Sequence, residues 1–322
     1  MERAAVPDAA LAAAYDAAER GCLAVGHDPP GVVVARGSTA LDFLHRMSTN
    51  DLSALPPLAV RGTVLTTAIG RIVDVIDVIR RPDDTLLITG PGQAETVRAW
   101  LGRHIFFNDD VVLDSRTDIY RLWGWYGPQA DESARELGDL QIPTGERVTV
   151  IDDGLVWEVV RPVRGLRCLA GPSLHRAAAV RWGDCAPGSP SAAAYEVLRI
   201  EAGLPAPGAE IDPDVIPLEI GLWDRVSFTK GCYIGQEVIA RMESRSRIAR
   251  RLVGLHLATA VELPQGVIVD GQAMGRMTSV ATSPRLGPIG LALIRAMGDR
   301  LPEQAVLAPA GVPASIRELP FG

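Results

Sequence analysis

Lysine is almost absent from this sequence. Of its 32 lysine and arginine residues, 31 are arginine, so Lys230 is the only lysine in 322 residues. Arginine carries a flat, wide guanidinium fork, whereas lysine carries a compact ammonium with rotatable donors. In a chain that uses arginine everywhere else, the remaining lysine is expected where a guanidinium cannot replace it. Lys230 therefore marks the first place to look for a functional site.

Other scarcities exclude whole classes of protein. No apolar run approaches the roughly 18 residues of a membrane-spanning helix. Acidic residues interrupt the alanine-rich N-terminus, unlike a secretory or mitochondrial leader. The four cysteines form no CxxC pair and have no paired histidine, so neither a zinc site nor a disulfide framework is expected. A net charge of −7 argues against binding a nucleic-acid backbone. We expect a reduced, cytoplasmic protein with no metal ligands and no membrane or direct nucleic-acid partner.

The order of predicted elements repeats along the chain. After a helix over 9–24, the first unit is predicted as strand 31–36, helix 38–47, strands between 60 and 90, helix 93–104 and strand 111–113. The second unit is predicted as strand 120–126, helix 127–137, strands between 147 and 170, and helix 173–181. This recurrence is typical of a duplicated ferredoxin-like β-α-ββ-α-β element.

From about residue 250 the pattern changes to short β segments with closely spaced glycine and proline, which is typical of a small antiparallel barrel. We therefore predict an α+β protein in four parts. These parts are an N-terminal helical extension at 1–30, a first α+β unit at 31–116, a second at 117–245 that contains the lysine, and a C-terminal β-barrel at 246–322.

The run Lys230-Gly231-Cys232-Tyr233-Ile234-Gly235-Gln236-Glu237 combines several reactive features. Its two glycines allow tight turns and close approach to a ligand. The stretch 235–242 is predicted to be a helix with Glu237 near its positive N-terminal end. Cys232 then lies just before a helix N-terminus and two residues from an ammonium, and both effects lower the pKa of a thiol. The alternative is a small buried hydrophobic residue in a turn, the commonest role of a free cysteine.

Acidic residues form two further candidate sites. Glu201 follows Arg199 in the last turn of a predicted helix, where a carboxylate opposes the helix dipole. It could accept hydrogen bonds from a ligand with adjacent N–H groups, such as a pterin ring, or be an ordinary surface glutamate. Asp74 and Asp77 lie three apart in a predicted strand and point to opposite faces. At most one faces a given cleft, and Asp77 is more simply a solvent-facing acid.

The run from Lys230 to Glu237 resembles the signature of the YgfZ-type folate-binding proteins. These are relatives of the glycine cleavage T-protein and are associated with maturation or repair of iron–sulfur enzymes. The stretches 199–205, 217–219, 62–74, 275–279 and 290–295 are also similar to segments of that superfamily. The resemblance spans roughly residues 31–300.

This resemblance implies a three-lobed body around a central hole that receives tetrahydrofolate. By position Glu201, with Arg199 beside it, would hold the pterin, and Asp74 falls nearest the acid that T-proteins use beside the reactive folate nitrogen. The resemblance also places Gly231, Tyr233, Gly235, Gln236 and Glu237 at the cofactor site. T-proteins lack the cysteine of the run, so Cys232 favours the YgfZ side.

Three functions remain open at this point. The first is a tetrahydrofolate-binding accessory protein for iron–sulfur enzymes or cluster-assembly proteins, with Cys232 and Lys230 essential. The second is a folate-dependent one-carbon transferase or demethylase with Asp74 as acid or base. The third is a folate-binding scaffold without chemistry. One free cysteine is too few to hold a cluster, which usually takes four thiolates. An arginine is expected on the folate tail, and Arg241, Arg245 and Arg247 lie near the signature.

Overall fold

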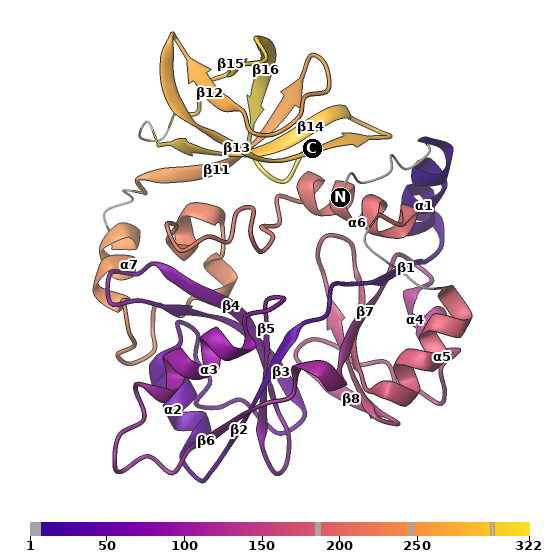
Figure 1. Cartoon of the computed structure of the whole chain (residues 1–322), viewed down its shortest axis with the longest axis vertical. Helices are drawn as coiled ribbons and strands as arrows, with labels where there is room; N and C mark the ends of the chain where they lie inside the picture. The colour runs from indigo at the N-terminus through magenta and orange to yellow at the C-terminus, as the bar shows by residue number, and fades with distance from the viewer. Residues whose placement is uncertain (1–7, 184–187, 245–247, 297, 299) are drawn as a thin grey trace.

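The computed structural model describes residues 8–183, 188–244, 248–296, 298 and 300–322, and it has three lobes (Figure 1). Two α/β lobes lie side by side, and a β-barrel lies across them, with helix α6 (Pro190–Glu201) between. Short 3-10 helices occur at Thr117–Ile119 (η1), Pro217–Ile220 (η2) and Trp223–Arg225 (η3). The three-lobed arrangement implied by the resemblance is confirmed.

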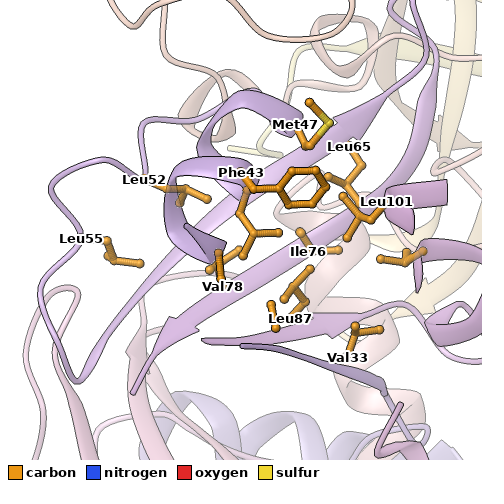
Figure 2. Close-up of a cluster of buried hydrophobic side chains, with 14 of the residues drawn as sticks. Val33, Phe43, Met47, Leu52, Leu55, Leu65, Ile76, Val78, Leu87 and Leu101 are labelled. Carbon is orange, nitrogen blue, oxygen red and sulfur yellow. The ribbon is translucent and has the colours of Figure 1, made fainter. Parts of the chain in front are cut away.

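The first α/β lobe is an antiparallel sheet in the order β3-β4-β5-β2-β6. Its elements are β2 (Gly31–Arg36), α2 (Ala40–Met47), β3 (Ala59–Thr66), β4 (Ile72–Arg80), β5 (Thr85–Thr89), α3 (Ala94–Gly102) and β6 (Val112–Ser115). Strand β4 alternates buried and half-buried residues, which is the period-2 signal of a strand. Figure 2 shows the core that forms where Phe43 and Met47 of α2 lie over Ile76 and Leu87 of the sheet.

The second α/β lobe has the same architecture in the order β8-β9-β10-β7-β1. Its elements are α1 (Asp8–Arg20), β1 (Leu23–Gly26), β7 (Arg121–Tyr126), α4 (Ala130–Arg135), β8 (Val148–Ile151), β9 (Gly154–Val159), β10 (Gly165–Ala170) and α5 (Pro172–Trp182). The expected helix over 9–24 was too long, because Leu23 and Val25 point into the core and residues 23–26 form a strand.

Strand β1, which completes the sheet of the second unit, comes from the N-terminal part of the chain, before the first unit. It pairs with β7 as β6 pairs with β2 in the first lobe, so the two sheets match strand for strand. The predicted duplication therefore holds for the order of elements within the two sheets. The last strand of the second repeat, however, is supplied by the N-terminal segment rather than by the chain after α5.

The two sheets face each other. Val32 and Ile79 of the first sheet share a buried cluster with Leu155, Trp157 and Leu169 of the second. Each sheet therefore packs against its helices on one side and against the other sheet on the opposite side.

The third lobe is a closed antiparallel barrel in the order β11-β14-β13-β12-β15-β16. Its strands are β11 (Arg250–Leu257), β12 (Gly266–Val269), β13 (Gln272–Ser283), β14 (Gly287–Arg295), β15 (Gln304–Ala308) and β16 (Val312–Arg317), and helix α7 (Gln236–Ser244) precedes them. The barrel predicted from the sequence is confirmed. A cluster that includes Ile72 of β4, Ile200 of α6 and Leu291 of β14 joins it to the rest of the molecule.

Candidate functional site

A cavity of about 1050 Å³ lies where the three lobes meet. The first lobe contributes Val75 and Asp77, and the second contributes Trp157 and Arg167. Helix α6, the turn at 204–207, the segment 221–225 and barrel residues 280–282 complete the wall. Since all three lobes contribute, the site exists only in the assembled fold.

Lys230 does not point into this cavity. Its ammonium donates hydrogen bonds to the backbone carbonyls of His45, Ser48 (2.8 Å) and Asn50 (2.8 Å), and its side chain is buried. His45 lies in the last turn of α2, whose unpaired carbonyls favour a cation. Burial lowers the pKa of Lys230 to about 8. Three carbonyls that converge on one point suit a compact ammonium and not a planar fork, which explains why this cation is lysine.

The loop held by Lys230 forms part of the cavity wall. Asn50 lines the cavity, and its side-chain amide donates to the carbonyls of Gly62 (2.8 Å) and Asp224 (3.2 Å). Thr49 donates to the carbonyl of Arg225 at 2.7 Å. Hydrogen bonds from Lys230 to backbone carbonyls thus attach the signature segment to the loop that forms this wall, although the lysine itself does not line the cavity.

Cys232 is exposed and lies outside the cavity lining. The alternative of a small buried hydrophobic residue is therefore wrong for this cysteine. Gly231 is also exposed, and an added Cβ there would meet open space. The other described cysteines, Cys22 and Cys168, are half-buried and buried, while Cys185 lies outside the described residues. Of the described thiols, Cys232 is the one that solvent and a large partner reach most easily.

The rest of the signature anchors α7. Gly235 has a φ of +85°, and a Cβ there would lie 2.6 Å from the carbonyl oxygen of Thr67, so packing on the β3–β4 turn requires glycine. Tyr233 is buried with its ring 5.3 Å from the Lys230 ammonium. Gln236 begins α7, and Glu237 is exposed in its first turn. None of these residues lines the cavity.

Glu201 is buried at the end of α6, away from the cavity lining. Its carboxylate accepts hydrogen bonds from Tyr15 of α1 (2.8 Å) and Ser283 of β13 (2.5 Å), and it lies 3.5 Å from Arg285. These two hydrogen bonds and the ion pair offset its unfavourable position in the helix dipole without any ligand. The alternative of a solvated surface glutamate is wrong, and the geometry gives no support to a pterin at Glu201. The carboxylate of α6 that does line the cavity is Glu196.

Arg199 lines the cavity but is buried in a polar network. It pairs with Glu196 and Glu210 and donates to Ser279 of the barrel at 2.7 Å. The network joins α6, the turn at 204–211 and β13. Burial opposes the charge, yet these partners outweigh it and raise the pKa of Arg199. Its position fits a residue that shapes the wall more than one that meets a ligand directly.

The two strand acids are placed opposite to the simplest expectation. Asp77 lines the cavity and pairs with Arg225 (2.7 Å) and Arg167 (3.9 Å), so the expected solvent-facing acid is wrong. The second sheet, rather than solvent, covers this face of β4. Asp74 is buried on the other face, where it accepts hydrogen bonds from the backbone N–H of Gly90 (3.0 Å) and Val75 (2.9 Å). Burial raises the pKa of Asp74 to about 6.

Sequence reasoning missed the polar and charged residues between the two sheets. Arg167 donates to the hydroxyl of Tyr195 at 3.0 Å, and His27 shares a 2.7 Å hydrogen bond with Tyr126. Burial, helped by Arg167, lowers the pKa of His27 to about 3, so this imidazole is neutral. The one signal in the sequence is the single charged residue, Arg167, within the otherwise apolar strand β10. Of the expected tail-binding arginines, Arg241 pairs with Glu237 away from the cavity, while Arg245 and Arg247 lie outside the described residues.

Two family descriptions match this chain: the GCVT N-terminal domain over residues 21–146 and the glycine cleavage T-protein C-terminal barrel domain over residues 250–321. Together they cover more than half of it. The chain belongs to the GcvT-like superfamily. Its α/β lobes and barrel are the fold of that superfamily, which confirms the coarser part of the resemblance.

Individual relatives agree. The chain is 30% identical over 281 residues to a putative chloroplastic transferase of Arabidopsis thaliana, across 83% of this chain and 63% of the relative. It therefore spans less than two thirds of that plant protein. It is 27% identical to an aminomethyltransferase of Bacillus subtilis (strain 168), across 82% of this chain and 77% of the relative. Among solved structures, the glycine cleavage system aminomethyltransferase T from Bartonella henselae superposes with a TM-score of 0.81 at 19% identity, across 97% and 89% of the two chains. At that identity the likeness concerns the fold.

Within the described ranges, no cluster of three or more His, Cys, Asp or Glu side chains is placed to hold a metal ion. No helix in the described part of the chain is long and apolar enough to span a membrane.

Proposed function

We propose that the cavity binds tetrahydrofolate or a related reduced folate, and that the protein acts as an accessory factor for assembly or repair of iron–sulfur enzymes. The observation that carries the proposal is the cavity of about 1050 Å³ shared by all three lobes. Its size suits a ligand larger than a single ring system, since pockets for such molecules span roughly 300–1,000 Å³. Its superfamily supports a folate as the ligand.

The residues of the cavity fit the parts of a folate. Trp157, Val75 and Ile88 offer apolar surface for flat rings. Glu196 offers a carboxylate for the adjacent N–H groups of a pterin, in place of Glu201. Arginines offer donors for the carboxylates of the tail. A bound reduced folate would supply carriage of one-carbon units, while the chain would bind and orient it and shield it from water.

The accessory role rests on Cys232. Its thiol is exposed and lies outside the cavity lining, so a macromolecule can reach it while folate occupies the cavity. One thiol cannot complete the usual four-thiolate ligation of a cluster. A partner protein would therefore provide the remaining ligands or the cysteine that Cys232 meets.

A second candidate is a folate-dependent one-carbon transferase. One observation favours it: the Asp74 carboxyl, with its pKa raised to about 6, lies directly behind Gly90, which lines the cavity. A carboxyl with such a pKa suits proton transfer near neutral pH. Several relatives carry the name aminomethyltransferase.

Complementation of a strain that lacks its own such protein separates the candidates. Cys232→Ser, Lys230→Arg and Asp74→Asn are scored on the activity of a radical iron–sulfur enzyme and on oxidant sensitivity. Loss with Cys232→Ser and retention with Asp74→Asn support the accessory role. Loss with Asp74→Asn alone contradicts it and supports the transferase.

Calorimetry with 5-formyltetrahydrofolate, a stable reduced folate, tests the cavity itself. We expect Glu196→Gln to weaken binding about tenfold, as for a lost charged hydrogen bond, and Cys232→Ser to leave binding unchanged. An absence of binding to the wild-type protein would refute the folate proposal.

A further inference from the structure

We infer that Arg225 and Arg167 form an anion subsite on the inner wall of the cavity, and that this subsite takes a carboxylate of the bound ligand. The inference rests on the proposed folate site and names which of the 31 arginines meets the carboxylate. The two guanidinium groups approach the same acid, Asp77, one from strand β10 and the other from the segment 221–225.

The charge balance at this point is positive. Arg225 and Arg167 both face Asp77, so two fixed cations share one carboxylate. Burial opposes ionisation of Asp77, but the two arginines outweigh it and hold its pKa below the usual range. Arginine does not lose its proton in proteins. One unit of positive charge therefore remains uncompensated in a partly buried wall, where an anion from a ligand would stabilise it.

Nearby groups do not supply the missing charge. The neighbouring His27 is neutral, and burial raises the pKa of Tyr126 so that its phenol keeps its proton. The acids Glu146, Glu158 and Glu196 of the lining pair with Arg61, Arg164 and Arg199 instead. Asp28 and Asp224 are exposed, and neither lies within ion-pair distance of Arg225 or Arg167 among the described residues.

A glycine in strand β3 leaves room for the side chain of Arg225. Gly62 lies inside strand β3, directly opposite Asp77, where glycine is an unfavourable strand residue. A Cβ at Gly62 would lie 2.3 Å from Nη1 of Arg225. The absence of a side chain at Gly62 therefore leaves the space that the guanidinium of Arg225 occupies against the sheet. Among the described residues, Arg225 uses Nη1 for Asp77 and for the carbonyl of Ile76, which leaves Nε and Nη2 for a ligand.

The subsite selects for carboxylate ligands. The side chains of Asp77, Arg167 and Arg225 are 16%, 22% and 25% exposed, so the donors are open to the cavity but shielded from bulk solvent. A guanidinium fork matches a carboxylate in two parallel hydrogen bonds. The benzoylglutamate part of a folate carries such carboxylates, whereas its pterin ring carries none.

Calorimetry with three probes tests the subsite: 5-formyltetrahydrofolate, p-aminobenzoylglutamate, which has the carboxylates only, and 6-methyltetrahydropterin, which has the ring only. We expect Arg225→Gln to weaken the binding of the first two probes 10- to 100-fold, as for a lost charged hydrogen bond. Its affinity for the pterin should fall by less than threefold. Gly62→Ala, which displaces the guanidinium without removing it, should weaken the same two probes. The matched control Arg241→Gln, away from the cavity, should change none.

The outcomes separate this inference from the folate proposal. If the wild-type protein binds none of the probes, the proposed function fails. If it binds 5-formyltetrahydrofolate and Arg225→Gln binds equally well, the anion subsite alone is wrong. Arg161 is an exposed arginine of the lining that has no acidic partner among the described residues. If Arg161→Gln loses affinity for the carboxylate probes and Arg225→Gln does not, the carboxylate lies at Arg161 and our assignment is overturned.

Discussion

The ammonium of Lys230 donates a hydrogen bond to the backbone carbonyl of Asn50 at 2.8 Å, and Asn50 lines the central cavity. Two residues further along the chain, Cys232 is exposed. The lysine thus joins the segment that carries the surface thiol to the wall that would hold the ligand. Its contribution is to position this wall, which gives the scarcity of lysine in the chain a structural explanation.

Lys230→Met should destabilise the fold. It leaves three backbone carbonyls without their charged donor, and we expect a loss of about 3 kcal/mol in the free energy of unfolding. Lys230→Arg should lose at least about 1 kcal/mol, because a planar fork cannot serve three converging acceptors. Urea unfolding measures both. Arg241→Met is the control: it breaks an exposed pair with Glu237 and should cost less than about 0.5 kcal/mol. Equal losses of stability at Lys230 and Arg241 would contradict a stabilising role for the three hydrogen bonds of Lys230.

The pKa of Lys230 can be measured without ambiguity. In protein labelled with ¹³C-lysine, a single side-chain signal is expected, and it should titrate near pH 8 rather than 10.5. Since the folded pKa is the lower one, the folded state binds fewer protons than the unfolded state between these values. Stability should therefore rise with pH in that window, and Lys230→Met should lose this rise. A titration near 10.5 would show that the ammonium is solvated.

Secondary structure and the barrel could be predicted from local pattern, whereas the site could not. The alternation of apolar and other residues predicts strand β4. A glycine followed by helix-forming residues predicts helix α7. Which face of β4 meets the cavity depends on the second sheet, which covers Asp77 rather than exposing it. That contact is between residues about 90 positions apart, and no local pattern encodes it.

Long-range partners also explain the environment of Glu201. The sequence showed a carboxylate opposed to its helix dipole, which correctly signalled an unusual environment. The donors that satisfy it, Tyr15 and Ser283, lie 186 and 82 residues away. A ligand and a distant side chain satisfy the same hydrogen-bonding need, so sequence alone could not distinguish them. Similarly, nothing in residues 23–26 indicates that this strand completes the sheet of another repeat.

Glu201→Ala should therefore weaken the fold and spare the ligand. It leaves the buried hydroxyl groups of Tyr15 and Ser283 without their acceptor, and we expect a loss of about 2–4 kcal/mol in the free energy of unfolding. Tyr15→Phe removes only one of these hydrogen bonds and should cost about 1 kcal/mol. Affinity for 5-formyltetrahydrofolate should change less than twofold in folded Glu201→Ala. A tenfold loss of affinity at unchanged stability would restore the pterin role.

The described thiols should differ sharply in reactivity. Cys232 is exposed, while Cys168 is buried and burial raises its pKa, so Cys232 should be alkylated at least about 100-fold faster in the native protein. Mass spectrometry of peptides after brief treatment with iodoacetamide measures each site. Denatured protein is the control, because both thiols should then react at similar rates. Slow labelling of native Cys232 would contradict its role as the contact with a partner.

The two glycines of the signature should respond oppositely to alanine. Gly235→Ala places a Cβ 2.6 Å from the carbonyl oxygen of Thr67 at a φ of +85°, so either the β3–β4 turn or α7 must shift. We expect a loss of about 2–4 kcal/mol in the free energy of unfolding. Gly231→Ala meets open space at an ordinary φ and should leave stability unchanged or raise it by about 0.5 kcal/mol, since alanine narrows the unfolded ensemble. Thermal unfolding of the two variants side by side decides the matter. If Gly231→Ala is stable yet fails in complementation, the open surface beside Cys232 is needed by a partner; if it is as unstable as Gly235→Ala, the loop geometry described above is wrong.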